Sequence, residues 1–314
     1  MRKLFRAHDG RIHLFWRLLS YTFFYMALMA VAMFVQEKVL HQPRTTIAGA
    51  LFYIGVMVTG TWWLTRTFRR RADRRPWGGM ALPSLRGGNT GLLLLGFTAG
   101  LVLFGLVFGV ELYAGLLEVT GFEAARSGLS GAITFLVAGL LYDLTPGFTE
   151  EVVMRGYWFQ NIGEGRPVWI STVIMGIFFA LMHFGEIGPR MLIFIPSVLI
   201  ISTALVMTRL LTGSLWLAIG WHTAWNFAQH YVFGVSAVGL ELHPWVAVKL
   251  TGPAWLVGAP GMPEEGLVGI AAELLGVALL LGWMAWRRKR IDWRAVLTPE
   301  GHLETAPAPQ RLSA

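Results

Sequence analysis

The chain contains about eight stretches of roughly 20 predominantly apolar residues, and this repetition constrains its fold more than any other feature. A helix needs about 20 such residues to cross the hydrocarbon core of a bilayer. The stretches cover residues 18–35, 46–65, 91–117, 131–162, 168–183, 191–211, 214–233 and 267–286. They predict an all-α fold, a polytopic membrane helix bundle of about eight transmembrane helices.

The composition supports this membrane assignment. Hydrophobic residues make up 55% of the chain and charged residues only 14%, whereas a soluble domain needs a larger polar share. Cysteine is absent, which excludes a disulfide framework and a thiol nucleophile. The net charge is +8, and in a membrane protein an excess of arginine more often sets topology than binds nucleic acid. We therefore expect the lipid bilayer, and no nucleic acid, among the partners.

The basic residues predict the orientation. With the N-terminus in the cytoplasm, the cytoplasmic segments receive the N-terminal arginines and the clusters at 66–75 and 287–290, as the positive-inside rule requires. We predict a basic cytoplasmic N-terminal segment (1–17), a transmembrane bundle (18–286) and a basic, disordered cytoplasmic tail (287–314). Both termini are then cytoplasmic. Residues 236–266 contain four prolines and are expected to form a loop on the outer side.

A few polar side chains interrupt the apolar stretches. A charged group in a membrane helix costs roughly 2.5–3.5 kcal/mol on insertion scales, so such residues are functional candidates by default. The informative ones are Asp143, Glu150, Glu151, Arg155, His183, His222 and Asn226.

The fourth stretch carries two adjacent glutamates. Pro146 and Gly147 are expected to interrupt the helix just before them. If the helix then resumes, Glu151 and Arg155 lie four residues apart on one face, which favours an ion pair. Glu150 points about 100° away, so it is left to accept a proton from water. The alternative is an ion pair that only holds two helices together, with Glu150 facing a polar crevice.

Two further motifs lie on other stretches. Phe179 and His183 share a helix face, and so do His222 and Asn226. An imidazole and a carboxamide that project together can donate hydrogen bonds to an oxyanion. Either motif could instead serve packing or interhelical hydrogen bonding. From a rise of about 1.5 Å per residue, we expect Glu150, His183 and His222 to meet at a similar depth.

These three motifs, in this order, resemble the CPBP family of CAAX-processing and bacteriocin-processing intramembrane proteases, also called the Abi or lysostaphin-resistance-like family. The family pattern is a double glutamate with an arginine four residues after the second, then Phe-x-x-x-His, then His-x-x-x-Asn. The chain matches every position within residues 131–235. One departure is Met154, where a phenylalanine is common before the arginine, and it should affect packing more than chemistry.

The resemblance implies an endopeptidase that hydrolyses a peptide bond of a membrane-associated peptide or protein. Under this interpretation Glu150 and His183 activate the attacking water, and His222 and Asn226 stabilise the oxyanion. Glu151 and Arg155 hold the motif in shape. A prenylated CAAX tail, a bacteriocin precursor and a membrane-anchored factor remain open as substrates. We expect a multi-pass protein of a bacterial cell membrane.

The resemblance leaves the cofactor open between two cases. We expect none, because a histidine paired with Asn226 suits oxyanion binding better than metal ligation. The alternative is zinc held by Glu150, His183 and His222, with one position left open for water.

Rival functions have different sequence signatures. The chain has no His-Glu-x-x-His motif, and Asp143 has no second aspartate in a Gly-x-Gly-Asp setting. Gly128–Gly131 matches a rhomboid serine motif, but the His-x-x-x-Asn motif follows it instead of preceding it. A proton-coupled transporter also uses buried glutamates and histidines, although inverted repeats are missing here. A non-catalytic immunity or binding protein with idle motifs is the third alternative.

Overall fold

The structure is a computed structural model, and it describes residues 7, 10–43, 46–183, 191–235, 243–259 and 263–286. The predicted tail at 287–314 and the first six residues of the predicted N-terminal segment lie outside them.

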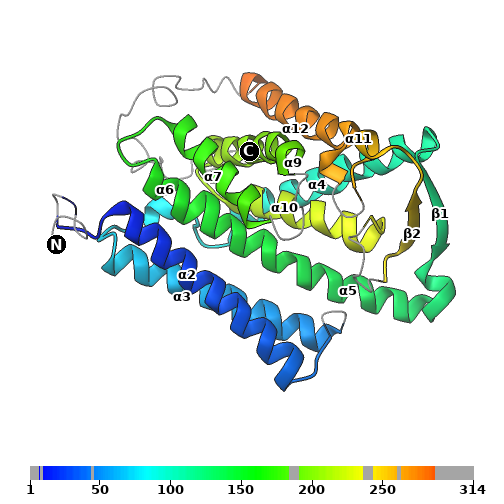
Figure 1. Cartoon of the computed structure of the whole chain (residues 1–314), viewed down its shortest axis with the longest axis horizontal. Coiled ribbons are helices and arrows are strands. Elements are labelled where there is room, and N and C mark those ends of the chain that lie inside the picture. The colour runs from blue at the N-terminus through cyan, green and yellow to red at the C-terminus, as the bar shows by residue number, and fades with distance from the viewer. Residues whose placement is uncertain are drawn as a thin grey trace.

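Long apolar helices make up most of the described chain (Figure 1), which confirms the all-α membrane bundle. They are α2 (Leu14–Phe34, continued by the π-helix η1, Val35–Val39), α3 (Ile47–Arg71), α4 (Gly88–Tyr113), α5 (Glu123–Glu151), α9 (Met191–Thr212) and α12 (Leu267–Trp286). Within the described residues, six helices are long and apolar enough to span a membrane. The expected number of eight is not confirmed, because α7 (Val168–Met182) and α10 (Trp216–Phe227) have only 15 and 12 residues.

The helix that carries the double glutamate is not interrupted at Pro146. It runs through α5, the π-helix η3 (Val152–Trp158) and α6 (Phe159–Ile162) as one span of 40 residues. The expected break is therefore wrong. The irregular point lies earlier, at Gly128, where φ is 73° and ψ is 166°. A proline is tolerated inside membrane helices because neighbouring groups and local π-type adjustments satisfy the freed backbone groups.

A two-stranded antiparallel sheet lies at the end of the molecule opposite the N-terminus (Figure 1). Strand β1 (Leu117–Phe122) pairs with β2 (Val246–Leu250), so that Leu117 faces Leu250 and Phe122 faces Val246. The segment 236–266 is thus not only a loop, since it contains β2 and the short helix α11 (Ala254–Val257). Pairing between segments more than 120 residues apart leaves no local signal, which is why neither strand was expected.

Glycines let α10 approach its two neighbouring helices closely. A Cβ atom on Gly96 of α4 would collide with the carbonyl oxygen of Leu217, and one on Gly220 with that of Leu93. On the other side, a Cβ on Gly147 of α5 would collide with the hydroxyl of Thr223. Small residues permit such close backbone contact in membrane bundles. Helix α10 is therefore held between α4 and α5, and continues as the π-helix η5 (Ala228–Val232).

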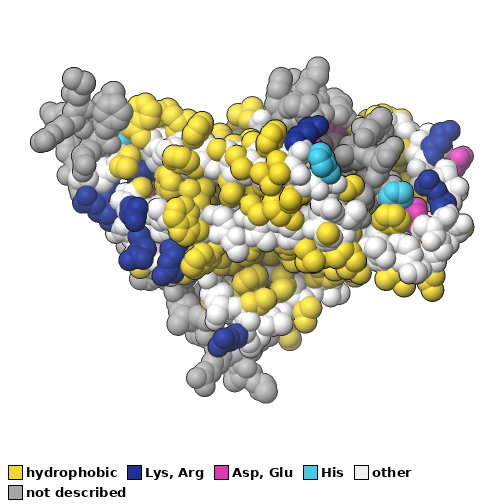
Figure 2. All heavy atoms as spheres, turned by 90° about the horizontal axis from the view of Figure 1, so that it is seen from below, with side chains coloured by type: hydrophobic (Ala, Val, Ile, Leu, Met, Phe, Trp, Pro, Cys, Tyr) yellow, Lys and Arg dark blue, Asp and Glu magenta, His cyan; other side chains and the backbone are white. Residues whose placement is uncertain are grey.

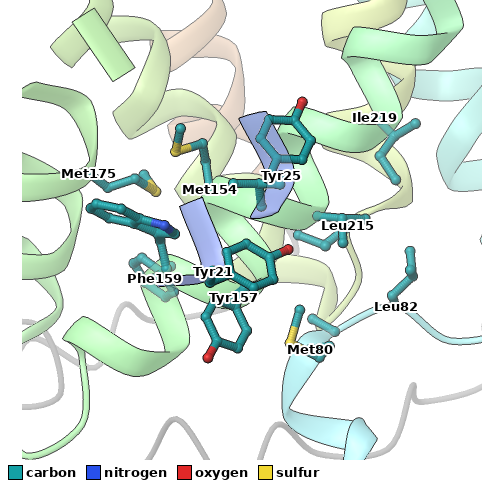
Figure 3. Close-up of a cluster of buried hydrophobic side chains, with 14 of the residues drawn as sticks. Tyr21, Tyr25, Met80, Leu82, Met154, Tyr157, Phe159, Met175, Leu215 and Ile219 are labelled. Atoms are coloured by element: carbon teal, nitrogen blue, oxygen red, sulfur yellow. The ribbon is translucent and has the colours of Figure 1, made fainter. Parts of the chain in front are cut away.

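The π-helix η3 lies at the centre of the larger hydrophobic core. All seven of its residues are buried, and Met154 and Tyr157 pack among side chains of α2, α7 and α10 (Figure 3). Tyr157 stacks on Tyr21 of α2 with ring centroids 3.9 Å apart. Large apolar side chains are also exposed on the outside of α2, α4 and α12, and hydrophobic groups cover much of the face in Figure 2. Such a surface suits contact with lipid.

Candidate active site

Glu151, the last residue of α5, is the centre of the candidate site. Its side chain is fully buried. Its Oε1 atom accepts a hydrogen bond from Nη1 of Arg155 at 2.8 Å and lies 2.9 Å from Nδ1 of His222. The ion pair expected from the four-residue spacing is therefore present. The same oxygen of Glu151 contacts His222 of α10 and so orients the imidazole. Its second oxygen, Oε2, is buried and makes no hydrogen bond to any described residue.

Glu150 differs from its neighbour in exposure. Its side chain is 22% exposed, and its Oε2 lies 3.8 Å from Nε2 of His222. That distance exceeds a hydrogen bond but leaves the two groups in electrostatic contact. The imidazole of His222 thus lies between two carboxylates, with Nδ1 on the buried one and Nε2 toward the accessible one. Since Nδ1–H donates to Glu151, Nε2 of the neutral ring accepts a proton, and the protonated ring donates from both nitrogens.

Arg155 connects the site to two more helices. Its side chain is 1% exposed. Besides the bond to Glu151, its Nη2 donates to the hydroxyl of Ser202 in α9 at 2.9 Å. Its guanidinium lies over the ring of Phe179 in α7, 5.6 Å from the centroid. One side chain therefore links α7 and α9 to η3. Ser202 could not be selected from the sequence, because a single serine in an apolar helix belongs to no recognisable motif.

The Phe-x-x-x-His motif lies at the C-terminal end of α7. His183 follows the last residue of that helix, and its Nδ1 lies 2.9 Å from the carbonyl oxygen of Phe179. Its ring is 4.6 Å from the ring of Phe179. Phe179 thus lies between Arg155 and His183, which joins this motif to the double-glutamate motif. The predicted convergence of His183 with Glu150 stays a prediction.

Asn226 lies one turn after His222 on α10. Its side chain is partly exposed, as is that of His222, whereas the intervening Thr223, Ala224 and Trp225 are buried. Both side chains therefore lie on the accessible face of α10. Two donors in this relation can point at one oxygen atom, which is the arrangement that an oxyanion requires.

The described residues do not assemble a metal site. No group of three or more His, Cys, Asp or Glu side chains in this part of the chain is arranged to hold a metal ion. The proposed set of Glu150, His183 and His222 is thus not brought together as three ligands among the described residues. Chelation is the direct test of the zinc alternative.

Comparisons with known proteins identify the same segment. Residues 131–228 match the family model described as Rce1-like, type II CAAX prenyl endopeptidase. The match confirms the resemblance to the CPBP family over about a third of the chain, and it includes all the residues of the three motifs. Neither the curated proteins nor the solved structures give a significant match.

Proposed function

From the match of residues 131–228 to the type II CAAX prenyl endopeptidases, we propose that this integral membrane protein hydrolyses a peptide bond by means of a glutamate-activated water. The family supports a CAAX-type protease with a protein or peptide substrate in general. The observation that supports our assignment of residues is the position of His222 between one buried and one accessible carboxylate.

In the proposed reaction, the accessible carboxylate of Glu150 takes a proton from water as the oxygen attacks the scissile carbonyl carbon. The carbonyl oxygen becomes an oxyanion, which Nε2–H of protonated His222 and the amide of Asn226 stabilise. Glu150 then gives the proton to the leaving nitrogen as the C–N bond breaks. His183 is assigned to help Glu150 orient the water, by the family resemblance alone.

Glu151 and Arg155 have a positioning role in this mechanism. Glu151 is buried and hydrogen-bonded to both Arg155 and His222, so it fixes the orientation of the imidazole. A carboxylate that orients a histidine and stabilises its charged form is a recurring device in hydrolases. We assign the basic end of the bundle, with the arginines at 66–75, to the cytoplasmic side by the positive-inside rule.

The first prediction tests this assignment with Glu150→Gln. The amide cannot accept the proton from water, so we expect cleavage of a CAAX-type peptide in detergent to fall at least about 1,000-fold, within the range of losing a general base and its charge. The control is Glu118→Gln, which changes an exposed glutamate of β1 and should leave activity unchanged. Each assay is repeated with a chelator, because loss of activity on chelation would support the zinc alternative.

Other outcomes would contradict the proposal. Full activity of Glu150→Gln would exclude the glutamate mechanism. Absence of cleavage together with solute uptake into proteoliposomes that depends on Glu150 would favour the transporter. Absence of both, with unchanged cellular phenotype of Glu150→Gln and His222→Ala, would favour an idle binding protein.

A further inference from the structure

A second carboxylate–histidine pair lies on the same two helices as the first. Asp143 of α5 is buried, and its Oδ2 lies 3.2 Å from Nδ1 of His230 in η5. Asp143 precedes Glu151 by eight residues, and His230 follows His222 by eight. Both pairs use Nδ1 of the histidine and a buried carboxylate of α5. Two such pairs at equal intervals require α5 and α10 to run antiparallel in one fixed register.

Two glycine contacts repeat in the same register. Gly147 packs on Thr223, and Gly139, eight residues earlier, packs on the ring of Tyr231, eight residues later. A Cβ atom at either glycine would collide with its partner. The π-helix η5 begins at Ala228, between the two histidines, and its wider turn changes the phase of the helix at that point. Glycine contacts and acid–histidine pairs thus alternate along the interface between α5 and α10.

We propose that Asp143 and His230 are positioning residues, which set the register of α10 against α5 and thereby hold His222 at Glu150 and Glu151. This inference rests on the proposed function. Eight residues of helix correspond to about 12 Å, so neither residue of the second pair touches the reacting atoms. A slide or rotation of α10 would change the 3.8 Å separation between Glu150 and His222. A misplacement of about 1 Å can cost about 100-fold in rate.

The test compares Asp143→Leu with Asp143→Asn. Leucine removes the acceptor, whereas asparagine keeps an oxygen for Nδ1–H of His230. We expect kcat to fall about 10- to 100-fold in Asp143→Leu with KM unchanged, and asparagine to restore most of it. Asp143→Leu combined with His230→Leu should be no worse than either change alone, because the pair acts as a unit. Thr145→Val, a buried change on the same helix, should leave kcat unchanged.

A second measurement is independent of activity. The imidazole ¹⁵N shifts of His222, assigned through their loss in His222→Asn, should change in Asp143→Leu and stay as in the wild type in Asp143→Asn. Unchanged shifts together with unchanged kcat would overturn the positioning role, and so would an effect of Asp143→Leu on KM alone. A wild type that cleaves no peptide contradicts the proposed function instead, and the His222 shifts then still decide the register question. If Asp143→Leu does not fold, His230→Asn takes its place in both measurements.

A different part of the chain carries an independent inference. Six arginines lie within residues 66–75 at the C-terminal end of α3, and they divide into two groups. Arg69 forms an ion pair with Asp73, and Arg75 forms an ion pair with Glu164. The other four are exposed and make no ion pair with any carboxylate of the described residues; they are Arg66, Arg70, Arg71 and Arg74. Figure 2 shows basic side chains gathered at this end, beside a broad hydrophobic surface.

Aromatic side chains precede these arginines on the same helix. Trp62 and Trp63 are 41% and 65% exposed, and the guanidinium of Arg66 lies 5.2 Å from the ring of Trp62. Trp62, Arg66 and Arg70 follow at intervals of four and form one stripe along α3. Tryptophans of membrane proteins are enriched at the level of the lipid headgroups, and on α3 the arginines follow the tryptophans toward the C-terminal end of the helix. We infer that this stripe binds the phosphate of an anionic phospholipid, with the acyl chains against the tryptophans.

The experiment measures lipid binding by native mass spectrometry and by the thermal shift in detergent. We expect phosphatidylglycerol to bind and stabilise the protein more than phosphatidylcholine, and the difference to shrink in 1 M salt. Arg66→Gln with Arg70→Gln should weaken phosphatidylglycerol binding about 30-fold, which is about fivefold per arginine. The control removes two charges from the opposite end of the molecule through Arg126→Gln and Lys249→Gln, which are both exposed.

Equal binding of the two lipids, or an equal loss in the control variant, would overturn this lipid site. Inorganic phosphate at the same concentration should give no stabilisation, and stabilisation by phosphate alone would contradict a lipid as the ligand. The single variants Arg66→Gln and Arg70→Gln replace the double variant if that protein does not fold.

Discussion

At the scale of single residues, two adjacent glutamates are given different environments by the helix that carries them. Glu151 faces the interior, where Arg155 and His222 both contact one of its oxygens. Glu150 is turned by about 100° and keeps an accessible carboxylate. A buried charge is stable only when it is paired, so the inner glutamate is suited to a fixed structural charge. The outer one can exchange protons with water, which the proposed reaction needs.

Arg155 gives the second prediction. In Arg155→Met, a side chain of similar length removes the charge and leaves Glu151 buried with His222 as its remaining partner. Removing one member of a buried ion pair costs about 3–5 kcal/mol, so we expect a loss of that size in the free energy of unfolding. The measurement is equilibrium unfolding in mixed micelles. The control, Arg71→Met, changes an exposed arginine that makes no ion pair with any carboxylate of the described residues, and it should stay within about 0.5 kcal/mol. A loss below about 1 kcal/mol in Arg155→Met would show that the pair is not essential.

At the scale of elements, the position of α10 decides the geometry of the site. It carries His222 and Asn226, and glycines on both neighbouring helices allow it to lie close to them. Gly147 is on α5, between the two acid–histidine pairs, and directly opposite Thr223. A methyl group there has no free space, so the two helices must separate.

The third prediction is that Gly147→Ala lowers both stability and activity. Overpacking a tight contact costs typically about 1–3 kcal/mol, and the separation of α5 and α10 moves His222 away from Glu150. The measurements are the free energy of unfolding and kcat. Gly109→Ala in α4 is the matched control, because a Cβ there meets no atom within 4 Å. That change should be neutral or stabilise the helix by about 0.5–1 kcal/mol. If both variants behave alike, the close approach of α10 does not control the site.

The same elements show how far the sequence could predict this molecule. The Glu151–Arg155 pair followed from a spacing of four residues, and the apolar stretches gave the helices. The contact of Glu151 with His222 joins residues 71 positions apart, so only the packing of α5 on α10 creates it. The break expected at Pro146 was wrong because a proline rule from soluble helices does not account for neighbouring membrane helices. The strand pair depended on contacts between distant segments.

At the scale of the whole molecule, polar contacts connect the hairpin formed by α2 and α3 to the helix that carries Glu150, Glu151 and Arg155. Asp73 accepts hydrogen bonds from Arg17 of α2 at 3.0 Å and from Tyr157 of η3 at 3.0 Å. A second set of contacts surrounds Glu164 in the turn after α6, whose carboxylate pairs with Arg11 and Arg75. Both sets lie at the same end of the bundle as the exposed arginines of α3. The N-terminal hairpin is thereby connected to η3, two residues from Arg155.

The fourth prediction concerns the pH dependence of this connection at Glu164. Burial alone would raise the pKa of the Glu164 carboxyl, but hydrogen bonds and charge from Arg11 and Arg75 outweigh it and hold that pKa below its ordinary range. A group with a lowered pKa in the folded state stabilises the protein fully above its unfolded pKa of about 4.3. That contribution is lost as the pH falls through the folded pKa. In unfolding measurements between about pH 6 and pH 3, the wild type should lose more stability than Glu164→Gln, because glutamine has no proton to gain. Parallel curves for wild type and Glu164→Gln would show that the arginine contacts of Glu164 do not hold the hairpin against the site.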